Sequence, residues 1–246
     1  MGEILAVLSG KGGTGKTSVT AGIATALAAL GESVLCIDCD TGLRNLDIAL
    51  GMAQTDTLSF LDVIQGSYTL DQAAGHPRYP SLRFLTAPVN CKADEIDRYA
   101  FSAMLRKARE SFSYVLLDAP AGVELGFSLC AAYADRVILV TCPEPAAVRD
   151  AARAGQMLEL MGKPDVRLVV NRVSKKLFQV MNVTVDDVMD EAGLPLLGII
   201  PEDPNVTLAA AFQEPLLRYK KRGAAAKACR RIAKRILGQP VPITVR

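Results

Sequence analysis

Residues 10–17 read GKGGTGKT, and this stretch decides the fold. It fits the pattern G-x-x-x-x-G-K-[ST], in which glycines allow the backbone to wrap closely around phosphate groups. An apolar run at residues 4–8 precedes it, and an alanine-rich helical pattern at residues 18–30 follows it. A strand, a glycine loop and a helix in this order predict a phosphate-binding loop, because backbone N–H groups and the helix dipole both attract an anion.

The motif assigns a role to each residue of this loop. Lys16 is expected to reach the β- and γ-phosphates of a nucleoside triphosphate, and the Thr17 hydroxyl is expected to bind Mg²⁺. A second lysine, Lys11, follows the first glycine, where an ordinary phosphate loop does not need one. The other residues expected to contact the nucleotide phosphates are Gly10, Gly12, Gly13, Thr14, Gly15 and Ser18.

Apolar runs alternate with helical patterns along the chain. Most of the runs are unbroken, as expected of strands that are buried on both faces. We therefore predict an α/β fold of the P-loop NTPase kind, a mostly parallel sheet with helices on both faces. We expect one domain over residues 1–238 and a short irregular tail over residues 239–246. The runs are residues 4–8, 34–37, 82–85, 114–117, 137–140, 168–170 and 196–200.

Three aspartates lie at the ends of predicted strands. Asp38 and Asp40 follow the run 34–37, and Asp118 follows the run 114–117. Ligands of parallel sheets bind at the carboxyl ends of the strands, beside the predicted loop. Carboxylates there can hold Mg²⁺ through water or orient an attacking water. We predict that Asp38 and Asp118 lie on the metal side of the site, although aspartate also caps turns and helices.

Four further segments carry a family resemblance. They are TGLRNLDIALG at 41–51, DAPAGVELG at 118–126, PEPAAVRDA at 143–151 and GIIPEDPNV at 198–206. Together with the lysine-rich loop KGGTGKT, they resemble the MinD/ParA family of ATPases with a deviant phosphate loop. The GLRNLD segment favours the MinD branch, which places the division septum, over the partition branch. The resemblance runs from residue 4 to about residue 238.

The resemblance implies an ATP-dependent switch with ATP and Mg²⁺ as cofactors. ATP would close a homodimer in which Lys11 reaches the partner's phosphates, as an arginine finger does. Asp40 corresponds to the residue that positions the hydrolytic water, and Asn171 to the residue that hydrogen-bonds adenine. Slow turnover would be accelerated by a regulatory protein bound near Asp150. The other residues that correspond to the base-binding side are Arg172, Pro201, Glu202 and Asp203.

Other functions of the same fold stay open at this point. One is a ParA-like or flagellar-number ATPase that acts on DNA or on a polar complex. Another is a biosynthetic enzyme that uses ATP to activate a carboxylate. A reductase of the nitrogenase iron-protein type would need cluster cysteines, and the spacing of Cys91, Cys130 and Cys142 does not match one.

Charge is distributed unevenly along the chain. Residues 1–214 hold 26 acidic and 18 basic residues, a net charge of −8, whereas residues 215–246 hold ten basic residues and no acidic one. The segment 223–237 predicts an amphipathic helix whose apolar face packs on the sheet. Its basic face could contact an anionic membrane, with nonspecific DNA ranked behind because no aromatic residue is present for stacking. The family's membrane-targeting helix is not matched by the final GQPVPITVR.

The remaining features point to the cytoplasm, with peripheral contact at the inner face of the cell membrane. We expect no signal peptide and no membrane-spanning helix, and the scattered cysteines suit a reducing compartment. Cys36 and Cys39 lie in one predicted strand with opposite orientations, so we expect no metal or redox pair. The only histidine, His76, precedes Pro77 in the most loop-like part of the chain, and we expect it to be exposed and without a chemical role.

Overall fold

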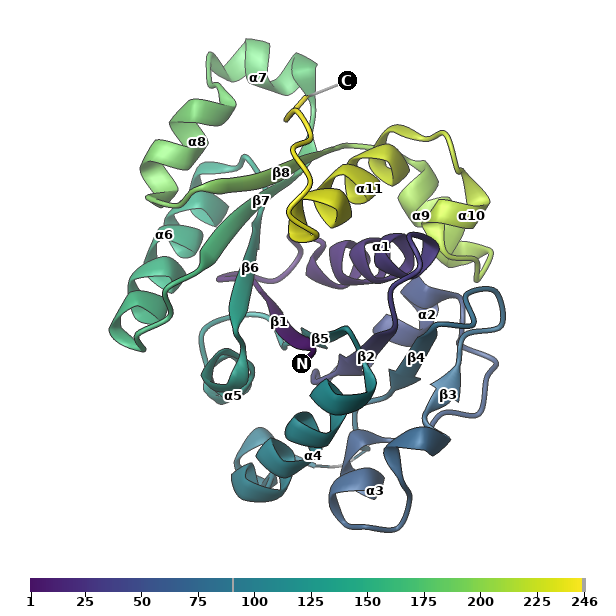
Figure 1. Cartoon of the computed structure of the whole chain (residues 1–246). Helices are drawn as coiled ribbons and strands as arrows, with labels where there is room; N and C mark the ends of the chain where they lie inside the picture. The colour runs from purple at the N-terminus through teal and green to yellow at the C-terminus, as the bar shows by residue number, and fades with distance from the viewer. Residues whose placement is uncertain (90, 245–246) are drawn as a thin grey trace.

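An eight-stranded sheet forms the centre of the computed structural model, which describes residues 1–89 and 91–244 (Figure 1). The strand order is β3-β4-β2-β5-β1-β6-β7-β8, and neighbours are parallel except for the antiparallel β3 and β4. The predicted fold class is therefore confirmed. The strands are β1 (Glu3–Leu8), β2 (Val34–Asp38), β3 (Ala74–Gly75), β4 (Leu82–Leu85), β5 (Tyr114–Asp118), β6 (Arg136–Thr141), β7 (Val166–Val173) and β8 (Leu196–Pro201).

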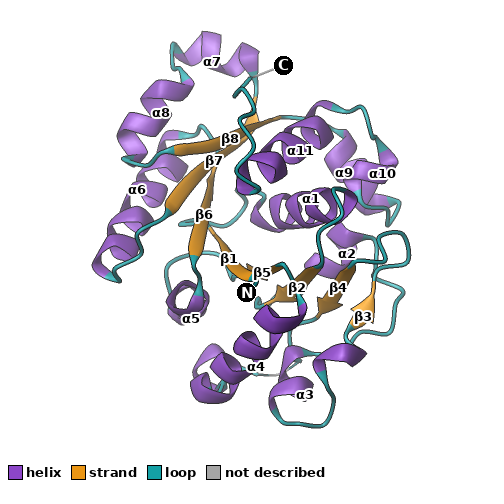
Figure 2. Ribbon diagram, viewed as in Figure 1, coloured by secondary structure: helices purple, strands orange, loops and turns teal. Residues whose placement is uncertain are grey.

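Helices cover both faces of this sheet (Figure 2). One core lies under α1 (Lys16–Ala29), α2 (Leu46–Leu50) and α11 (Ala224–Ile236), with α9 (Asn205–Ala211) and α10 (Leu216–Tyr219) beside them. The core of the other face lies under α4 (Arg98–Ser111), α5 (Leu125–Tyr133) and α6 (Pro145–Leu160), with the short α3 (Phe60–Ile64) beside α4. Two further helices, α7 (Lys175–Met181) and α8 (Val185–Ala192), follow β7.

Alternate residues of each central strand enter opposite cores. In β1, Ala6 and Leu8 lie in one core while Leu5 and Val7 lie in the other. Both faces are apolar, so the strand reads as an unbroken apolar run. Cys36 and Cys39 likewise lie in opposite cores, as predicted from their spacing. No helix in the described part of the chain is both long and apolar enough to cross a bilayer.

Two strands differ from the sequence prediction. β7 extends to Val173, beyond the predicted run 168–170, and so includes the polar residues Asn171 and Arg172. The short edge strand β3, Ala74–Gly75, was not predicted. β3 has only two residues, which is too short for a sequence pattern to identify it. The end of β7 is polar, so the apolar run that predicted this strand stops before the strand does.

His76 is buried, so the prediction of an exposed loop histidine was wrong. Its side chain is 4% exposed, and Nε2 donates to the Leu50 carbonyl at 2.8 Å. Nδ1 accepts the backbone N–H groups of Arg78 and Tyr79 at 3.0 and 3.2 Å. Burial lowers the pKa of His76, and the nearby positive charge of Arg78 acts in the same direction. The neutral ring joins the end of α2 to the loop before β4.

This arrangement predicts a pH-dependent stability. Because the pKa of His76 is lower in the folded state than the usual ~6.5, its stabilising effect is complete above that pH and is lost as the pH falls below it. We expect His76→Asn to lower the free energy of unfolding by about 2 kcal/mol at pH 7.5. The difference from wild type should shrink at pH 5.5, as measured by urea denaturation. Lys107→Gln, an exposed lysine on α4, is the control, and an equal loss at both pH values would contradict the assignment.

Candidate nucleotide site

The glycine loop lies between β1 and α1 and contacts α6 directly. A Cβ on Gly10 would lie 2.2 Å from the backbone oxygen of Asp150, so no larger residue fits there. Gly15 has a left-handed φ of 83°, and a Cβ there would lie 2.4 Å from Asn171 Nδ2. The loop is therefore held between α6 on one side and the end of β7 on the other.

A buried ion pair joins the loop to the neighbouring strand. Lys16 Nζ lies 2.8 Å from Asp118 Oδ1 at the end of β5, and the side chains are only 6% and 1% exposed. The Thr20 hydroxyl donates to the same oxygen at 2.8 Å. The sequence predicted that both Lys16 and Asp118 lie at the site, and the structure brings them together. It pairs them with each other, which the motif alone did not indicate.

Asp38 lies beside Asp118 at the end of the adjacent strand β2. Its carboxylate accepts the N–H of Asp40 at 2.9 Å and the N–H of Leu46 at 3.2 Å. Burial and the negative charge of Asp118 raise the pKa of Asp38 to about 7. Two buried carboxylates and one ammonium leave an excess of negative charge, which a divalent cation would offset. This donor set fits the predicted Mg²⁺ site.

Asp40 shapes the segment that follows β2. Its Oδ1 accepts the N–H groups of Gly42 and Leu43 at 3.1 and 3.2 Å, as in a turn closed by an aspartate. Arg44 adopts a left-handed φ of 42°, and its guanidinium donates to the Thr86 hydroxyl at 3.1–3.2 Å. The segment 40–46 is thus tied to Asp38 at both ends, and Arg44 ties it to Thr86 directly after β4.

The residues predicted for the base-binding side line one cavity. Its volume is about 60 Å³, and it opens beside the start of α1. The predicted residues that line it are Gly15, Ser18, Asn171, Arg172, Pro201, Glu202 and Asp203. Val19, Ile200, Val206, Thr207, Leu216, Ala225 and Cys229 complete the lining.

Asp203 also caps α11, a role that the sequence did not indicate. Its Oδ2 accepts the N–H of Ala225 in the first turn of the helix at 3.2 Å, and its Oδ1 accepts the N–H of Asn205 at 3.0 Å. Burial favours the neutral acid, but hydrogen bonds from Asn205 and α11 outweigh it and lower the pKa of Asp203. A carboxylate at a helix N-terminus is stabilising, and this one holds α11 against the cavity.

Two hydroxyls near the loop lack partners. Ser9 Oγ and Thr14 Oγ1 are buried and accept or donate no hydrogen bond within the described part of the chain. Buried polar atoms are normally paired, so such atoms fit a site where a ligand or water supplies the partner. Thr14 was among the predicted residues, whereas Ser9 was not; its position directly before the motif was the available signal.

Lys11 and Asp150 lie at the surface of this region. Lys11 is partly exposed, and it forms no ion pair with any residue in the described ranges. Asp150 is partly exposed on α6, and its backbone oxygen is the group that contacts Gly10. The two loop lysines therefore differ: Lys16 is paired inside the protein, and Lys11 is partly exposed with no ion pair among the described residues.

Arginines of the basic helix α11 form hydrogen bonds to backbone carbonyls of the same chain. Its apolar residues are buried, as predicted for the segment 223–237. Arg230 donates to the Lys221 and Leu217 carbonyls, and Arg231 donates to the Thr244 carbonyl. Arg235 donates to Leu197 and to the tail carbonyls of Val241 and Pro242. The predicted basic face is thus partly covered by the tail.

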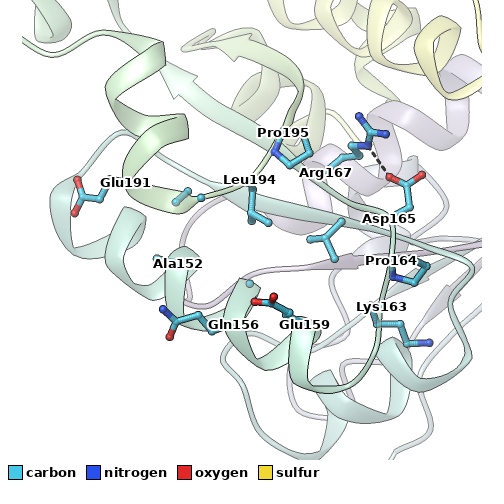
Figure 3. Close-up of a pocket in the computed structure, with 14 residues that line it drawn as sticks. Ala152, Gln156, Glu159, Lys163, Pro164, Asp165, Arg167, Glu191, Leu194 and Pro195 are labelled. Atoms are coloured by element: carbon cyan, nitrogen blue, oxygen red, sulfur yellow. Dashed lines mark hydrogen bonds and ion pairs between the residues drawn. The ribbon is translucent and has the colours of Figure 1, made fainter.

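A second hollow lies at the opposite end of the strands (Figure 3). It has a volume of about 490 Å³ between α6 and the loops that precede β7 and β8. Glu159, Glu191 and the pair formed by Asp165 and Arg167 line it. None of the predicted site residues is among its lining, so it is not part of the candidate nucleotide site.

The fold, the glycine loop and the strand-end aspartates define a P-loop nucleotide-binding protein. The family model "CobQ/CobB/MinD/ParA nucleotide binding domain" matches residues 5–216. Septum site-determining protein MinD of Synechocystis sp. is 38% identical over 244 residues, covering 98% of this chain and 92% of that protein. MinD of Bacillus subtilis is 37% identical over 250 residues, covering 100% and 92%.

Solved structures agree with these relatives. MinD in the MinC:MinD complex of Aquifex aeolicus superposes with a TM-score of 0.90 at 34% identity, covering 98% of each chain. MinD of Pyrococcus horikoshii, complexed with Mg-ADP, gives 0.83 at 28% identity, covering 96% of each chain. This chain belongs to the MinD/ParA family of nucleotide-binding proteins, which confirms the predicted resemblance.

Proposed function

We propose that the chain is a MinD-like ATPase that helps to place the division septum and works as an ATP-dependent dimerising switch. The difference between the two loop lysines carries this proposal. Lys16 is buried against Asp118, whereas Lys11 is partly exposed at the loop and has no ion-pair partner within the described residues. An unpaired lysine beside a phosphate site is suited to reach the phosphates of a second copy. The MinD relatives support the same function.

The chain's own groups account for the nucleotide step. Lys16 would exchange Asp118 for the β- and γ-phosphates, and this releases the Asp118 carboxylate. Thr17, Asp38 and Asp118 would hold Mg²⁺, which would supply positive charge to the phosphates. Asp38 has a pKa near 7 and gives up its proton readily when a cation approaches. Asp40 would orient the attacking water, and hydrolysis would be slow until a partner protein accelerates it.

Two contacts could pass the nucleotide state to the surface. Asp38 accepts the N–H groups of Asp40 and Leu46, so a change at Asp38 would move the segment 40–46, where Leu43 is 70% exposed. Gly10 touches the Asp150 backbone, so a change in the loop would move α6. We place a regulatory protein at α6 near Asp150. The complex of Aquifex aeolicus MinD with MinC supports a protein partner.

Replacing Lys11 tests the switch. We expect Lys11→Ala to retain ATP binding, because Lys16 still contacts the phosphates, and to abolish ATP-dependent dimerisation in sedimentation velocity. Hydrolysis should fall by a factor on the order of 10³, as for the loss of a finger residue. Lys175→Ala, an exposed lysine on α7, is the matched control. A Lys11→Ala variant that dimerises with ATP as wild type does would rule out the role in trans.

We also propose that the protein is cytoplasmic and contacts anionic membranes peripherally. The cations of α11 are largely engaged, so we assign this contact to a corner surface formed by Phe212, Tyr219, Lys220, Lys221 and Arg222. Phe212 is 65% exposed and stacks on Tyr219 with ring centroids 5.6 Å apart. The three following cations are exposed, and their side chains form no ion pair within the described residues. Nonspecific DNA ranks behind a bilayer, because an exposed aromatic beside cations suits a lipid interface.

The expected free energy of membrane binding is too small for a monomer and favours binding by the dimer. Each cation near an anionic surface contributes about 1 kcal/mol, and three give about 3 kcal/mol. This lies below the ~4.1 kcal/mol of millimolar affinity, so a monomer would bind weakly. Two copies in an ATP dimer would double the surface and bind through avidity.

Liposome cosedimentation tests the corner surface. Wild type should pellet with phosphatidylglycerol vesicles in ATP more than in ADP, and less at high salt. The triple variant K220Q/K221Q/R222Q should lose on the order of 100-fold in affinity for the vesicles, since about 3 kcal/mol of attraction per copy is removed. K107Q/K175Q/K176Q, which removes three exposed lysines of α4 and α7, is the charge-matched control. Unchanged pelleting of the triple variant would contradict the assignment. A triple variant that pellets with vesicles as wild type does but no longer binds DNA would favour DNA as the partner.

A further inference from the structure

The side chain of Asn171 is bonded to the phosphate loop. Its Nδ2 donates to the Thr14 carbonyl at 2.8 Å, and the two residues are only 7% and 2% exposed. The acceptor is a carbonyl oxygen, so the amide nitrogen must be the group directed at it. The resemblance implies a contact between Asn171 and adenine, and the structure adds a contact to the loop, made by one of the two N–H groups of Nδ2.

A local irregularity of β7 directs Asn171 toward the loop. β7 pairs with β8 up to Val170, and the register then shifts before Val173 pairs with Pro201. Arg172, inside this irregularity, has a left-handed φ of 55°. Bulges of this kind redirect side chains next to functional sites. The strand is thus shaped so that Asn171 leaves the ladder and lies over the glycine loop.

The loop side of the contact is equally constrained. A Cβ on Gly15 would lie 2.4 Å from Asn171 Nδ2, so the amide packs directly on this glycine. The Gly15 carbonyl accepts the Val19 N–H at 3.0 Å and begins the hydrogen bonding of α1. Hydrogen bonds therefore hold the carbonyls of two consecutive peptides, that of Thr14 and that of Gly15.

The geometry of a trans peptide gives this contact a consequence. The C=O of Thr14 and the N–H of Gly15 belong to one plane and point in opposite directions. Because Asn171 holds the C=O on the β7 side, the Gly15 N–H is turned away from β7. The loop then offers this N–H on the side away from β7, among the backbone donors that can bind phosphate oxygens.

We propose that Asn171 is a positioning residue for the phosphate loop, which it holds in its phosphate-binding conformation through the Thr14 carbonyl. This inference rests on the proposed function for its consequences in ATP binding, but its structural part applies to the nucleotide-free protein. Asn171 can still accept a hydrogen bond from a base through Oδ1, since an amide donates and accepts at once. Asn171 would mainly affect the affinity for the phosphates and not the selection of the base.

Hydrogen exchange in the nucleotide-free protein tests the structural part. Amides in a peptide spanning residues 9–17 should exchange roughly tenfold faster in Asn171→Ala than in wild type. Asn171→Asp has the same shape but offers no donor when ionised, so it should behave as the alanine variant does. Lys175→Ala, an exposed residue just after β7, is the control. Unchanged exchange in this peptide for both Asn171 variants would overturn the proposal, whatever the protein's function.

Binding of inorganic tripolyphosphate separates the loop from the base. Calorimetry in the presence of Mg²⁺ should show that Asn171→Ala binds ATP and tripolyphosphate with affinities reduced by the same factor, roughly tenfold. An equal reduction is expected when the phosphate loop itself is less well ordered. Weakening of ATP alone would assign Asn171 to the base and overturn the proposal. A wild-type protein that binds neither ligand would refute the proposed function and this consequence together, while the exchange experiment would still decide the structural part.

Discussion

The candidate site depends on one buried ion pair, Lys16 with Asp118. Two charges that are almost fully removed from water persist only when they are paired and hydrogen-bonded, and here Thr20 adds a second donor to the carboxylate. The pair fixes the first turn of α1 against β5, so the loop before it is closed in a defined position. Asp38 lies beside the pair, and burial and the charge of Asp118 raise its pKa to about 7, so its ionisation gives the site excess negative charge. The nucleotide-free protein is therefore poised for a cation and for an anion that releases the lysine.

The region around this pair is tied to one strand and two helices. Gly10 touches α6 at Asp150, Asn171 of β7 holds Thr14, and Asp38 holds the start of α2 through Leu46. Each tie joins the phosphate region to an element that reaches the surface. A switch needs such connections, because a nucleotide can change a distant surface only through groups whose contacts it alters. We infer that α6 and the segment 40–46 are the surfaces most directly coupled to the nucleotide.

Much of this architecture could be predicted from the sequence. Buried parallel strands are unbroken apolar runs, and GKGGTGKT has few structural alternatives between a strand and a helix. The residues of the base side were predicted by resemblance, and the structure places them around one cavity. The sequence did not indicate the burial of His76, the capping of α11 by Asp203, or the arginine contacts to the C-terminal tail. Each depends on backbone groups that are distant in sequence, which neither periodicity nor a motif can locate.

The central claim is that nucleotide binding breaks the ion pair between Lys16 and Asp118. The most direct measurement is a pair of crystal structures, one without ligand and one with Mg²⁺ and a non-hydrolysable ATP analogue. We predict that the distance from Lys16 Nζ to Asp118, 2.8 Å in the computed structure, stays in this range without ligand and exceeds ion-pair range in the complex, with the lysine on the phosphates. A complex that binds the analogue at the loop and keeps the ion pair intact would contradict the account.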